Sequence, residues 1–348
     1  LPSERVVEQR VIDTLRKVFE LNGFIGIETR AVETGASLLK KGETSKEIYL
    51  LSRLQEVGHE SDTPIEERLG LHFDLTVPLS RYVVEHSGAL AFPFKRWQIQ
   101  KVWRGERPQE GRFREFVQAD IDVIGNGDLP DHYEVELPLV MVSALERLRE
   151  FGLPKATVHA NNRKLSEGFY RGLGLTDIEG VLREIDKLDK IGADKVRELL
   201  TDTCGVTGEN ADEILRFIAC PGTSADKLAF LEQYRGRNET FDTGLDELRT
   251  VVGYLPAFGV PEENFELDLT IARGLDYYTG TVYETVLLDH PEVGSICSGG
   301  RYDDLAGYYT NKSLPGVGIS IGLTRLFYIL QEQNMISDAV LTAPADVL

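Results

Sequence analysis

Apolar side chains at helical spacing open the chain. Residues 4 to 22 carry them at Val7, Val11, Leu15 and Val18, which predicts an amphipathic helix. Ser3 is a candidate cap for this helix, and Asn22-Gly23 is a candidate end. Three strand-like segments follow, at residues 24–32, 48–55 and 71–77. Pro78 then predicts the start of another helix, which runs to about residue 85.

Alternation with period two is clearest on either side of an arginine-rich segment. Residues 96–102 and 115–124 alternate as strands do, and one face of the second strand carries Phe116, Gln118, Asp120 and Asp122. The segment between them contains the turn residues Gly105, Pro108 and Gly111. Strand, loop and strand predict an antiparallel hairpin. The polar face of its return strand suits the floor of a ligand pocket.

In the second half of the chain, the spacing of apolar residues changes twice. A helix is predicted at residues 131–151 and a strand at 156–159, and residues 164–255 then show mainly helical spacing. Residues 281–288 predict a strand, and residues 315–331 predict a strand that continues into an apolar helix. The helical stretch therefore predicts an insertion between the two halves of a β-rich domain.

Two dense polar clusters flank the strand at 281–288. The first is RGLDYYTG, residues 273–280, and the second is SGGRYDD, residues 298–304. An arginine, an aspartate and two adjacent tyrosines are costly to leave unsatisfied in a fold. We expect them to present charge and hydroxyl groups to a small polar ligand. Three glycines in the next strand would let a flat ring approach the backbone closely, Gly316, Gly318 and Gly322.

Composition narrows the class of protein. At 348 residues, one large domain with an insertion is expected. A net charge of −19 argues against broad nonspecific binding to nucleic acid but leaves room for a local basic track. Cys204, Cys220 and Cys297 lack metal-ligand spacing, which fits a reducing compartment. We expect no membrane span and no secretory leader.

Four motifs carry a resemblance to a known family. WRGERPQEGRFREFVQ (103–118) and GVGISIGLTRL (316–326) are similar to the second and third motifs of class II aminoacyl-tRNA synthetases. RGLDYYTG and SGGRYDD resemble the two histidine-specific motifs of the histidyl-tRNA synthetase family. The resemblance covers essentially the whole chain. It implies an α+β fold, with about six antiparallel strands flanked by helices and a helical insertion.

The resemblance also implies a division of the chain. Residues 1–164 would form the first part of the catalytic core, with a dimer helix and the ATP-binding hairpin, and residues 165–255 the helical insertion. Residues 256–340 would complete the core with the histidine motifs, the glycine strand and its helix. Residues 341–348 would begin a C-terminal anticodon-binding domain that is cut short, so we expect adenylate formation with poor tRNA charging.

The implied reaction has two steps and uses ATP, Mg²⁺, L-histidine and tRNA(His). Histidine attacks the α-phosphate of ATP to give histidyl-adenylate and pyrophosphate, and the histidyl group then passes to tRNA. By resemblance, Arg104 holds the α-phosphate and carboxylate side, Arg273 approaches from the opposite side, and Arg325 meets the γ-phosphate. Glu106 and Arg112 would help to position ATP. A cytoplasmic homodimer is expected.

The histidine pocket follows from the same resemblance. Asp74, Thr76 and Gln118 match the positions that accept the α-ammonium group. Asp122 and Tyr278 match the positions that contact the two ring nitrogens. Tyr277 and Tyr302 would close the pocket, although Tyr277 is equally suited to the core because the two adjacent tyrosines point to opposite faces.

Simpler interpretations stand beside these roles. The arginine-rich loop could be a solvated, salt-bridged loop in which Arg107 and Arg114 are structural. Asp120 could be a surface carboxylate, and the glycines could merely permit tight packing. The six histidines, scattered along the chain, are predicted to be structural or on the surface. Arg30 stands where the family's first motif has a proline of the dimer interface.

Two alternative functions remain at this point. One is a regulatory paralogue that serves histidine biosynthesis without catalysis, and such proteins would lose catalytic arginines. The other is a tRNA-sensing module, which predicts a degraded ATP loop. Arg104, Arg273 and Arg325 are all present and the loop is intact, which favours the enzyme.

Overall fold

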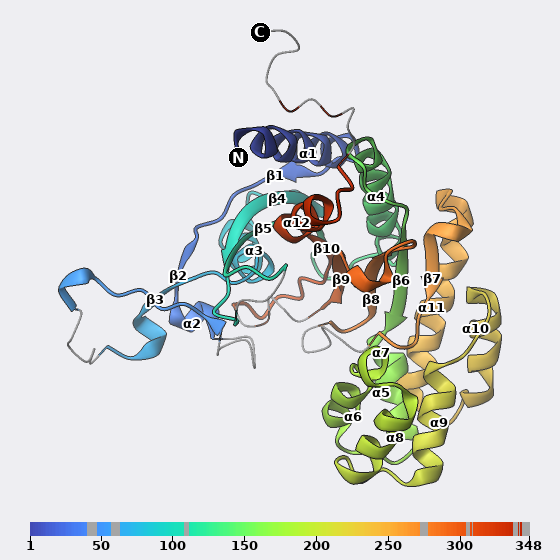
Figure 1. Ribbon diagram of the computed structural model, residues 1–348. Helices are drawn as coiled ribbons and strands as arrows, with labels where there is room; N and C mark the ends of the chain where they lie inside the picture. The colour runs from blue at the N-terminus through green and yellow to red at the C-terminus, as the bar shows by residue number, and fades with distance from the viewer. Residues whose placement is uncertain are drawn as a thin grey trace.

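An eight-stranded mixed sheet forms the centre of the protein (Figure 1). The computed structural model describes residues 1–39, 47–56, 63–107, 111–271, 278–303, 307, 309–336, 340 and 342. Within the sheet, six central strands are antiparallel to their neighbours, and one further strand is added in parallel at each edge. The strands, in spatial order, are β1 (Ile25–Gly26), β4 (Phe94–Trp103), β5 (Glu115–Ile124), β10 (Gly316–Gly322), β9 (Cys297–Tyr302), β8 (Thr281–Leu287), β6 (Ala156–Asn162) and β7 (Phe265–Leu267). This α+β architecture confirms the predicted fold class.

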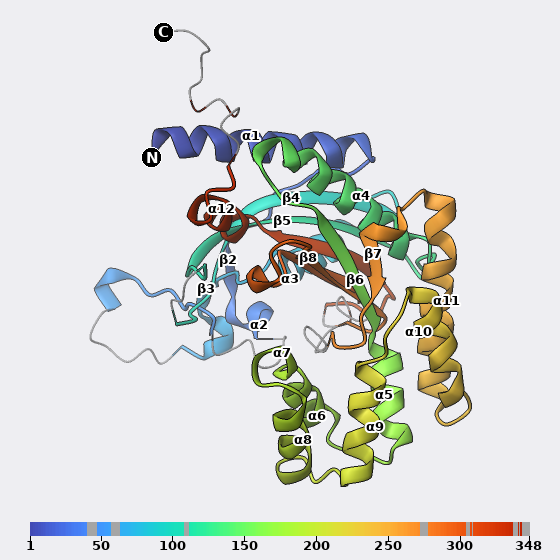
Figure 2. The same cartoon turned by 45° about the vertical axis from the view of Figure 1, so that its right-hand side comes forward.

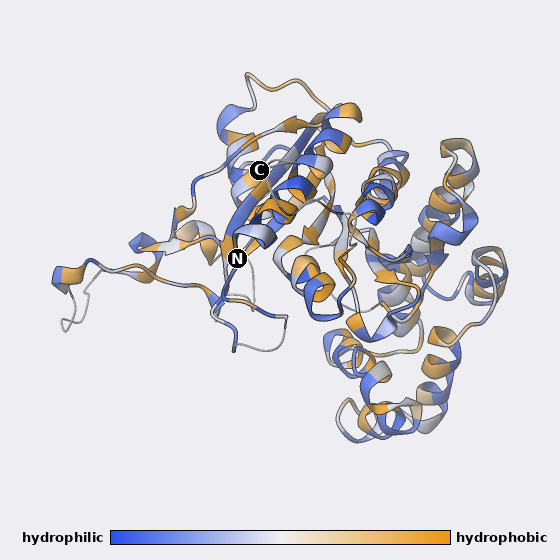
Figure 3. Ribbon diagram, turned by 45° about the horizontal axis from the view of Figure 1, so that its top comes forward, coloured by the Kyte–Doolittle hydropathy of each residue, from blue (hydrophilic) through white to orange (hydrophobic). Residues whose placement is uncertain are grey.

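One face of the sheet is apolar and is covered by helices. α1 (Pro2–Leu21), α4 (Tyr133–Leu148) and α12 (Leu323–Glu332) lie together on the upper side of the sheet in Figure 2. The buried side chains of β5 on this face are Ala119, Ile121 and Val123. Because the helices bury only one stripe each, both hydropathy colours run along their length in Figure 3. This packing forms the main hydrophobic core.

The opposite face of the sheet is polar, and we call it the polar face; it carries Arg96, Gln98, Gln118, Asp120, Asp122 and Ser320. At one end this face becomes apolar, where Phe94, Ile124 and Tyr302 meet Leu79 and Val83 of α3 (Thr76–His86). The helix α3 therefore covers the end of the polar face. A short two-stranded sheet stands apart from the main one, built from β2 (Val32–Thr34) and β3 (Leu69–Leu71) beside α2 (Gly35–Leu38).

Seven helices follow β6: α5 (Arg163–Gly172), α6 (Ile178–Ile185), α7 (Leu188–Ile191), α8 (Ala193–Asp202), α9 (Gly208–Ile218), α10 (Ser224–Leu231) and α11 (Glu239–Phe258). In Figure 1, α5 to α9 lie below the sheet, and α10 and α11 lie to its right. The helices α5 and α11 cross very closely. A Cβ on Gly168 would lie 2.1 Å from the backbone nitrogen of Phe241, and a Cβ on Gly244 would lie 2.2 Å from that of Leu165. Helical structure over the predicted 164–255 stretch is thereby confirmed.

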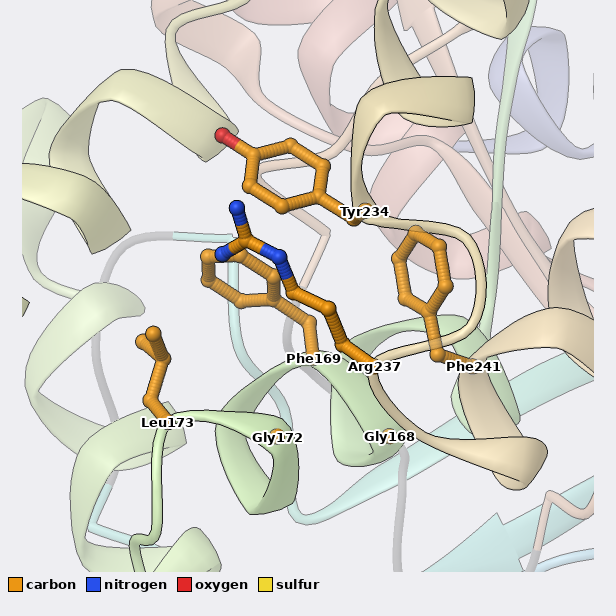
Figure 4. Close-up of a pocket in the computed structure, with 7 residues that line it drawn as sticks. All are labelled: Gly168, Phe169, Gly172, Leu173, Tyr234, Arg237 and Phe241. Atoms are coloured by element: carbon orange, nitrogen blue, oxygen red, sulfur yellow. The ribbon is translucent and has the colours of Figure 1, made fainter.

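A small hollow lies beside this crossing (Figure 4). Its volume of about 10 Å³ is close to that of a single water probe, so it cannot hold a substrate. Arg237 places its guanidinium carbon 4.9 Å from the ring centre of Tyr234, and the remaining lining is mostly apolar. We assign this hollow to the packing of the helical segment.

Several predicted elements need correction. The first helix begins at Pro2, so Ser3 lies inside it and does not cap it, whereas Asn22 ends it as predicted. Residues 48–55 contain only a single bridge, from Leu50 to Gly70, and a 3₁₀ turn at 54–56. Residues 71–77 are not a strand, because α3 already begins at Thr76 and the Asp74 carboxylate accepts the Val77 N–H at 3.1 Å.

The predicted strand 24–32 is interrupted for a specific reason. The side chain of Gln100 donates to the carbonyl of Thr29 at 2.9 Å and accepts from its N–H at 3.3 Å. A side chain thus takes the place of a strand partner, and only β1 and β2 remain regular at the two ends. The predictions for the hairpin strands, for α3, β8, β10 and α12 are confirmed within a few residues.

Candidate active site

Three transverse rows of residues define the polar face. The strand register places Arg96, Asp122, Gly318 and Gly300 in one row across β4, β5, β10 and β9. The next row contains Gln98, Asp120, Ser320 and Ser298. The third contains Gln100, Gln118 and Gly322. Charged and amide side chains thus gather on β4 and β5, and small residues lie beside them on β10 and β9.

The Asp122 carboxylate is fixed from two sides. Nη2 of Arg96 lies 2.7 Å from Oδ2, and the Tyr302 hydroxyl donates to Oδ1 at 2.5 Å. All three side chains are buried. Burial, together with the neighbouring Asp122 charge, raises the pKa of Tyr302 well above its usual value, so the phenol remains a donor. Asp122 and Tyr302, both predicted site residues, are therefore direct partners.

The glycines of β10 and β9 make room for these side chains. A Cβ on Gly318 would lie 2.0 Å from Oδ1 of Asp122, and a Cβ on Gly316 would lie 2.3 Å from Cε2 of Tyr302. A Cβ on Gly300 would lie 2.8 Å from Cδ1 of Tyr278. Close approach of aromatic rings to glycine is thus observed, and the rings belong to the protein itself. Gly322 has no such neighbour, since the nearest atom lies 3.9 Å away.

Asp120 is not a surface carboxylate, and that interpretation was wrong. The residue is only 2% exposed, because β4 and β10 flank it within the sheet. Burial raises the pKa of Asp120 to about 7, while Arg96 opposes the rise and the Asp122 charge adds to it. Arg96, which is fully buried, was not identified as a site residue. Its place in phase with Gln98 and Gln100 on an alternating strand was the available signal.

The predicted ammonium ligands lie at one end of the polar face. Gln118 is 9% exposed and its Nε2 donates to the Ser320 hydroxyl at 2.9 Å. Asp74 and Thr76 are buried at the start of α3. The Asp74 charge also contributes to the raised pKa of Asp120. Gln118 lies one step from Asp120 on the same face of β5, and Asp74 and Thr76 lie at the start of α3.

Arg104 begins the loop of the hairpin and is held by three contacts. Its N–H donates to the carbonyl of Arg114 at 2.9 Å, which closes the hairpin. Its side-chain Nε donates to the carbonyl of Phe73 at 3.0 Å, and its guanidinium carbon lies 5.1 Å from the centre of the Phe116 ring. Because Phe73 adjoins Asp74, these contacts place Arg104 next to the ammonium ligands.

Glu106 and Arg112 face each other within the same loop. Nη1 of Arg112 lies 3.3 Å from Oε2 of Glu106, and this arginine is about half exposed. Nε of Arg114 donates to the Glu106 carbonyl at 3.4 Å, which supports the structural role predicted for Arg114. In the described part of the loop, Arg112 therefore stays half exposed while the Glu106 carbonyl is held by Arg114.

Arg325 connects α12 to this loop and to the segment before β9. Its guanidinium donates to the carbonyl of Val293 at 2.7 Å and to that of Ser295 at 3.3 Å. A Cβ on Gly111 would lie 3.9 Å from its Nε. The rings of Phe113 and Tyr328 also pack at 5.5 Å between their centres. Arg325 therefore lies beside Gly111, in the loop that Arg104 begins.

Two predicted residues, Arg273 and Tyr277, lie outside the described residues. Tyr278 is described, and its ring packs against Gly300. Arg301, between Gly300 and Tyr302, points to the other face and pairs with the buried carboxylate of Glu134 at 2.8 Å. Strand β9 thus sends Tyr302 to the polar face and Arg301 to α4.

The described histidines include one that is clearly structural. His72 is fully buried, its Nε2 lies 2.7 Å from the carbonyl of Lys101, and burial lowers its pKa. His159 pairs with Asp268 at 2.8 Å. His59 lies outside the described residues. No group of three or more carboxylate, histidine or cysteine side chains suited to a metal occurs in the part of the chain that the structure describes. In that same part, no helix is both long and apolar enough to cross a membrane.

The antiparallel sheet, the arginine hairpin and the glycine strand that leads into an arginine-bearing helix together define the catalytic domain of a class II aminoacyl-tRNA synthetase. Comparison with known proteins identifies the family within this class. The profile of the histidyl-tRNA synthetase family matches residues 1–326. The chain therefore belongs to the histidyl-tRNA synthetase family of ATP-dependent aminoacyl-tRNA ligases.

Individual relatives agree with this assignment. A histidine–tRNA ligase of Bifidobacterium longum subsp. infantis is 72% identical over 359 aligned positions, which cover 100% of this chain and 76% of that protein. The crystal structure of histidyl-tRNA synthetase from Nostoc sp. PCC 7120 matches with a TM-score of 0.87 at 39% identity, over 99% of this chain and 76% of that one.

A more distant structure shares only the fold. The ATP phosphoribosyltransferase regulatory subunit/histidyl-tRNA synthetase from Bacillus halodurans has a TM-score of 0.76 at 21% identity, over 97% of this chain and 81% of that one. At this identity the likeness carries no information on function.

Proposed function

We propose that the chain activates L-histidine with ATP to histidyl-adenylate and pyrophosphate, and then transfers histidine to tRNA(His). The observation that carries this proposal is the Asp122 carboxylate, held by Arg96 and Tyr302 above the glycines of β10. A carboxylate that is buried and fixed in orientation can accept an N–H from an imidazole ring. Its position matches the ring-binding position of the family.

The substrate amino acid would lie along the polar face. Its ring would meet Asp122 and Tyr278, with Tyr302 and Tyr277 closing that end. Its α-ammonium group would meet Asp74, Thr76 and Gln118, which are all buried. An analogue without ring nitrogens would leave buried polar groups unpaired, and such penalties can reach a discrimination of about 10⁴.

ATP would lie along the hairpin loop. Arg104 would stabilise the negative charge that develops at the α-phosphorus, because a guanidinium grips two oxygens and stays protonated. Arg273 would do so from the opposite side, Arg325 would meet the γ-phosphate, and Glu106 and Arg112 would position the nucleotide. Mg²⁺ would arrive with ATP and would help to neutralise the charge of its phosphates.

Histidine-dependent exchange of pyrophosphate into ATP tests the first step. We expect exchange with the wild-type protein and a loss of about a thousandfold in Arg104→Ala, the size seen when a key transition-state charge is removed. Arg149→Ala is a matched control, since Arg149 is an exposed arginine whose guanidinium pairs with Glu146 at 3.1 Å. Absence of exchange at millimolar histidine in the wild type would favour the regulatory paralogue. Undiminished exchange in Arg273→Ala would remove Arg273 from the catalytic set.

The remaining assignments extend to larger partners. We place the chain in a cytoplasmic homodimer, with the segment around Arg30 near the interface; its guanidinium lies 3.9 Å from both Glu33 and Glu85. The helical stretch 165–255 is proposed as an insertion domain that contacts the acceptor arm of tRNA. Deletion of 165–255 should then weaken tRNA binding, and unchanged tRNA affinity and adenylation would rule out this role.

A further inference from the structure

Asp120 lies at the centre of the polar face, and among the described residues it shares its one cation, Arg96, with Asp122. The nearest guanidinium nitrogen, Nη2 of Arg96, is 3.7 Å from Asp120 but only 2.7 Å from Asp122. One buried guanidinium therefore stands against two buried carboxylates, and its closer contact is with Asp122. The other groups that bear on Asp120 do not neutralise it, because Asp74 is a third carboxylate and Ser320 is uncharged.

Acceptor atoms surround this carboxylate. Gln98, directly opposite on β4, and Gln118, on the same face of β5, each have a buried Oε1 with no hydrogen-bond partner among the described residues. Gln98 is fully buried and Gln118 is 9% exposed. The amide nitrogen of Gln98 donates to Thr29 and Gln100, which fixes the orientation of the amide. Its oxygen therefore points away from these two partners. Buried acceptors require donors, and Nε and Nη1 of Arg96, in the adjacent row of β4, are likewise buried without a hydrogen-bond partner among the described residues. An added ligand can therefore complete the hydrogen bonds of this region.

An ammonium group fits this environment. It carries one positive charge and three donors, and the site offers excess negative charge and unpaired acceptors. We propose that Asp120 is a further substrate-binding carboxylate, which draws the α-ammonium group of the amino acid into the pocket between Gln118 and Asp122. This inference rests on the proposed histidine activation and adds to it a residue that sequence reasoning placed on the surface.

A proton can compensate the charge of Asp120 whenever no ammonium group is bound. The pKa of Asp120, raised to about 7 by burial, means that the carboxyl is neutral below this pH and ionised above it. Ammonium and proton therefore compete for the same negative charge. Histidine affinity should gain a contribution from Asp120 only when that residue is ionised.

Calorimetric binding of histidine without ATP tests this competition. At about pH 8.5 the wild-type carboxylate is ionised, and Asp120→Asn should bind histidine roughly tenfold more weakly, as a pKa coupling of one unit implies. At about pH 6 the wild-type carboxyl is protonated and the two proteins should bind alike. Asp120→Ser supplies a second neutral side chain and should behave in the same way. A loss of affinity that is equal at both pH values would contradict the proposal.

Two controls separate charge from structure. Imidazolepropionate has the ring and the carboxylate of histidine but no ammonium group, so its affinity should not change in Asp120→Asn. Equal weakening of both ligands would mean that Asp120 acts only on the shape of the pocket. Glu134→Gln removes another buried carboxylate, on the opposite face of the sheet, and should leave histidine affinity at the wild-type value at both pH values.

Pyrophosphate exchange distinguishes this inference from the proposed function. A wild-type protein that binds histidine with the expected pH dependence but shows no exchange would contradict the ligase and leave the role of Asp120 standing. Exchange with a pH dependence of histidine affinity that persists in Asp120→Asn would contradict the role of Asp120 alone. A wild-type protein that does not bind histidine would contradict both.

Discussion

The ring of Tyr302 occupies the space in which a side chain on Gly316 would lie, since a Cβ there would come within 2.3 Å of Cε2. Gly318 stands in the same relation to the carboxylate of Asp122, at 2.0 Å. Two glycines of β10 thus keep two site residues in register across three strands. The third glycine, Gly322, has no neighbour closer than 3.9 Å and serves as their natural control.

Gly316→Ala should displace the Tyr302 ring and with it the donor to Asp122. We expect KM for histidine to rise about tenfold or more, because overpacking a tight contact costs about 1–3 kcal/mol, with KM for ATP unchanged. Steady-state exchange kinetics measure both constants. Gly322→Ala should retain the wild-type values. Wild-type kinetics in Gly316→Ala would mean that the position of the ring is unimportant.

Tyr302→Phe removes one hydroxyl from the floor of the site. A hydrogen bond to a charged group contributes about 1.5–3 kcal/mol, so we expect histidine KM to rise about tenfold to a hundredfold. Tyr283→Phe is the matched control, because its buried hydroxyl donates to the carbonyl of Glu134 at 2.5 Å, on the other face. That variant should lose thermal stability and keep its histidine KM. The same change in KM for both variants would refute a specific role for Tyr302.

Arg96→Met should destabilise the protein strongly. Removing one partner of a buried ion pair typically costs about 3–5 kcal/mol, because the remaining charges are left uncompensated. The triple variant Arg96→Met, Asp120→Asn, Asp122→Asn leaves no charge of this trio and should recover most of the loss. Urea unfolding gives both free energies. A triple variant less stable than the single one would show that shape, and not charge, dominates this region.

Asp120→Asn should change how stability depends on pH. The folded-state pKa of Asp120 is raised to about 7 from an ordinary 3.8, so the folded protein binds a proton that the unfolded chain releases. Its contribution to stability is complete below about pH 4, falls as pH rises towards about 7, and stays constant above that. Between about pH 4 and pH 7, the free energy of unfolding of the asparagine variant should therefore rise relative to that of the wild type, by at most about 4 kcal/mol. A stability difference that does not vary between about pH 4 and pH 7 would contradict the buried ionisation.

The sequence was sufficient to predict those helices and strands in which apolar residues recur with a clear period. The hairpin strands, the glycine strand and the first helix stand within a few residues of their predicted positions, because one face of each meets the core. Side chains that replace backbone partners were not predictable. The side-chain amide of Gln100 forms the hydrogen bonds of the Thr29 backbone. No local sequence pattern predicts that residues 24–32 separate into β1 and β2.

Site residues that belong to a sequence motif were predicted. Residues whose place in the site is determined only by packing were missed. Asp122 and Tyr302 were both assigned, but their hydrogen bond joins residues 180 positions apart and becomes visible only in the fold. Asp120 looked like a surface carboxylate because its strand alternates polar and apolar positions. The polar face of this antiparallel sheet is also buried. Alternation of polar and apolar residues therefore cannot distinguish a solvent-exposed face from the floor of a pocket.

The trio of Arg96, Asp120 and Asp122 also constrains how this protein can evolve. All three side chains are almost fully buried, so the loss of Arg96 alone leaves two carboxylates without compensation inside the fold. Gene copies that lose Arg96 while both carboxylates remain should be lost as unstable proteins before any new role can be selected. A descendant that has replaced Arg96 is therefore expected to have replaced both aspartates as well.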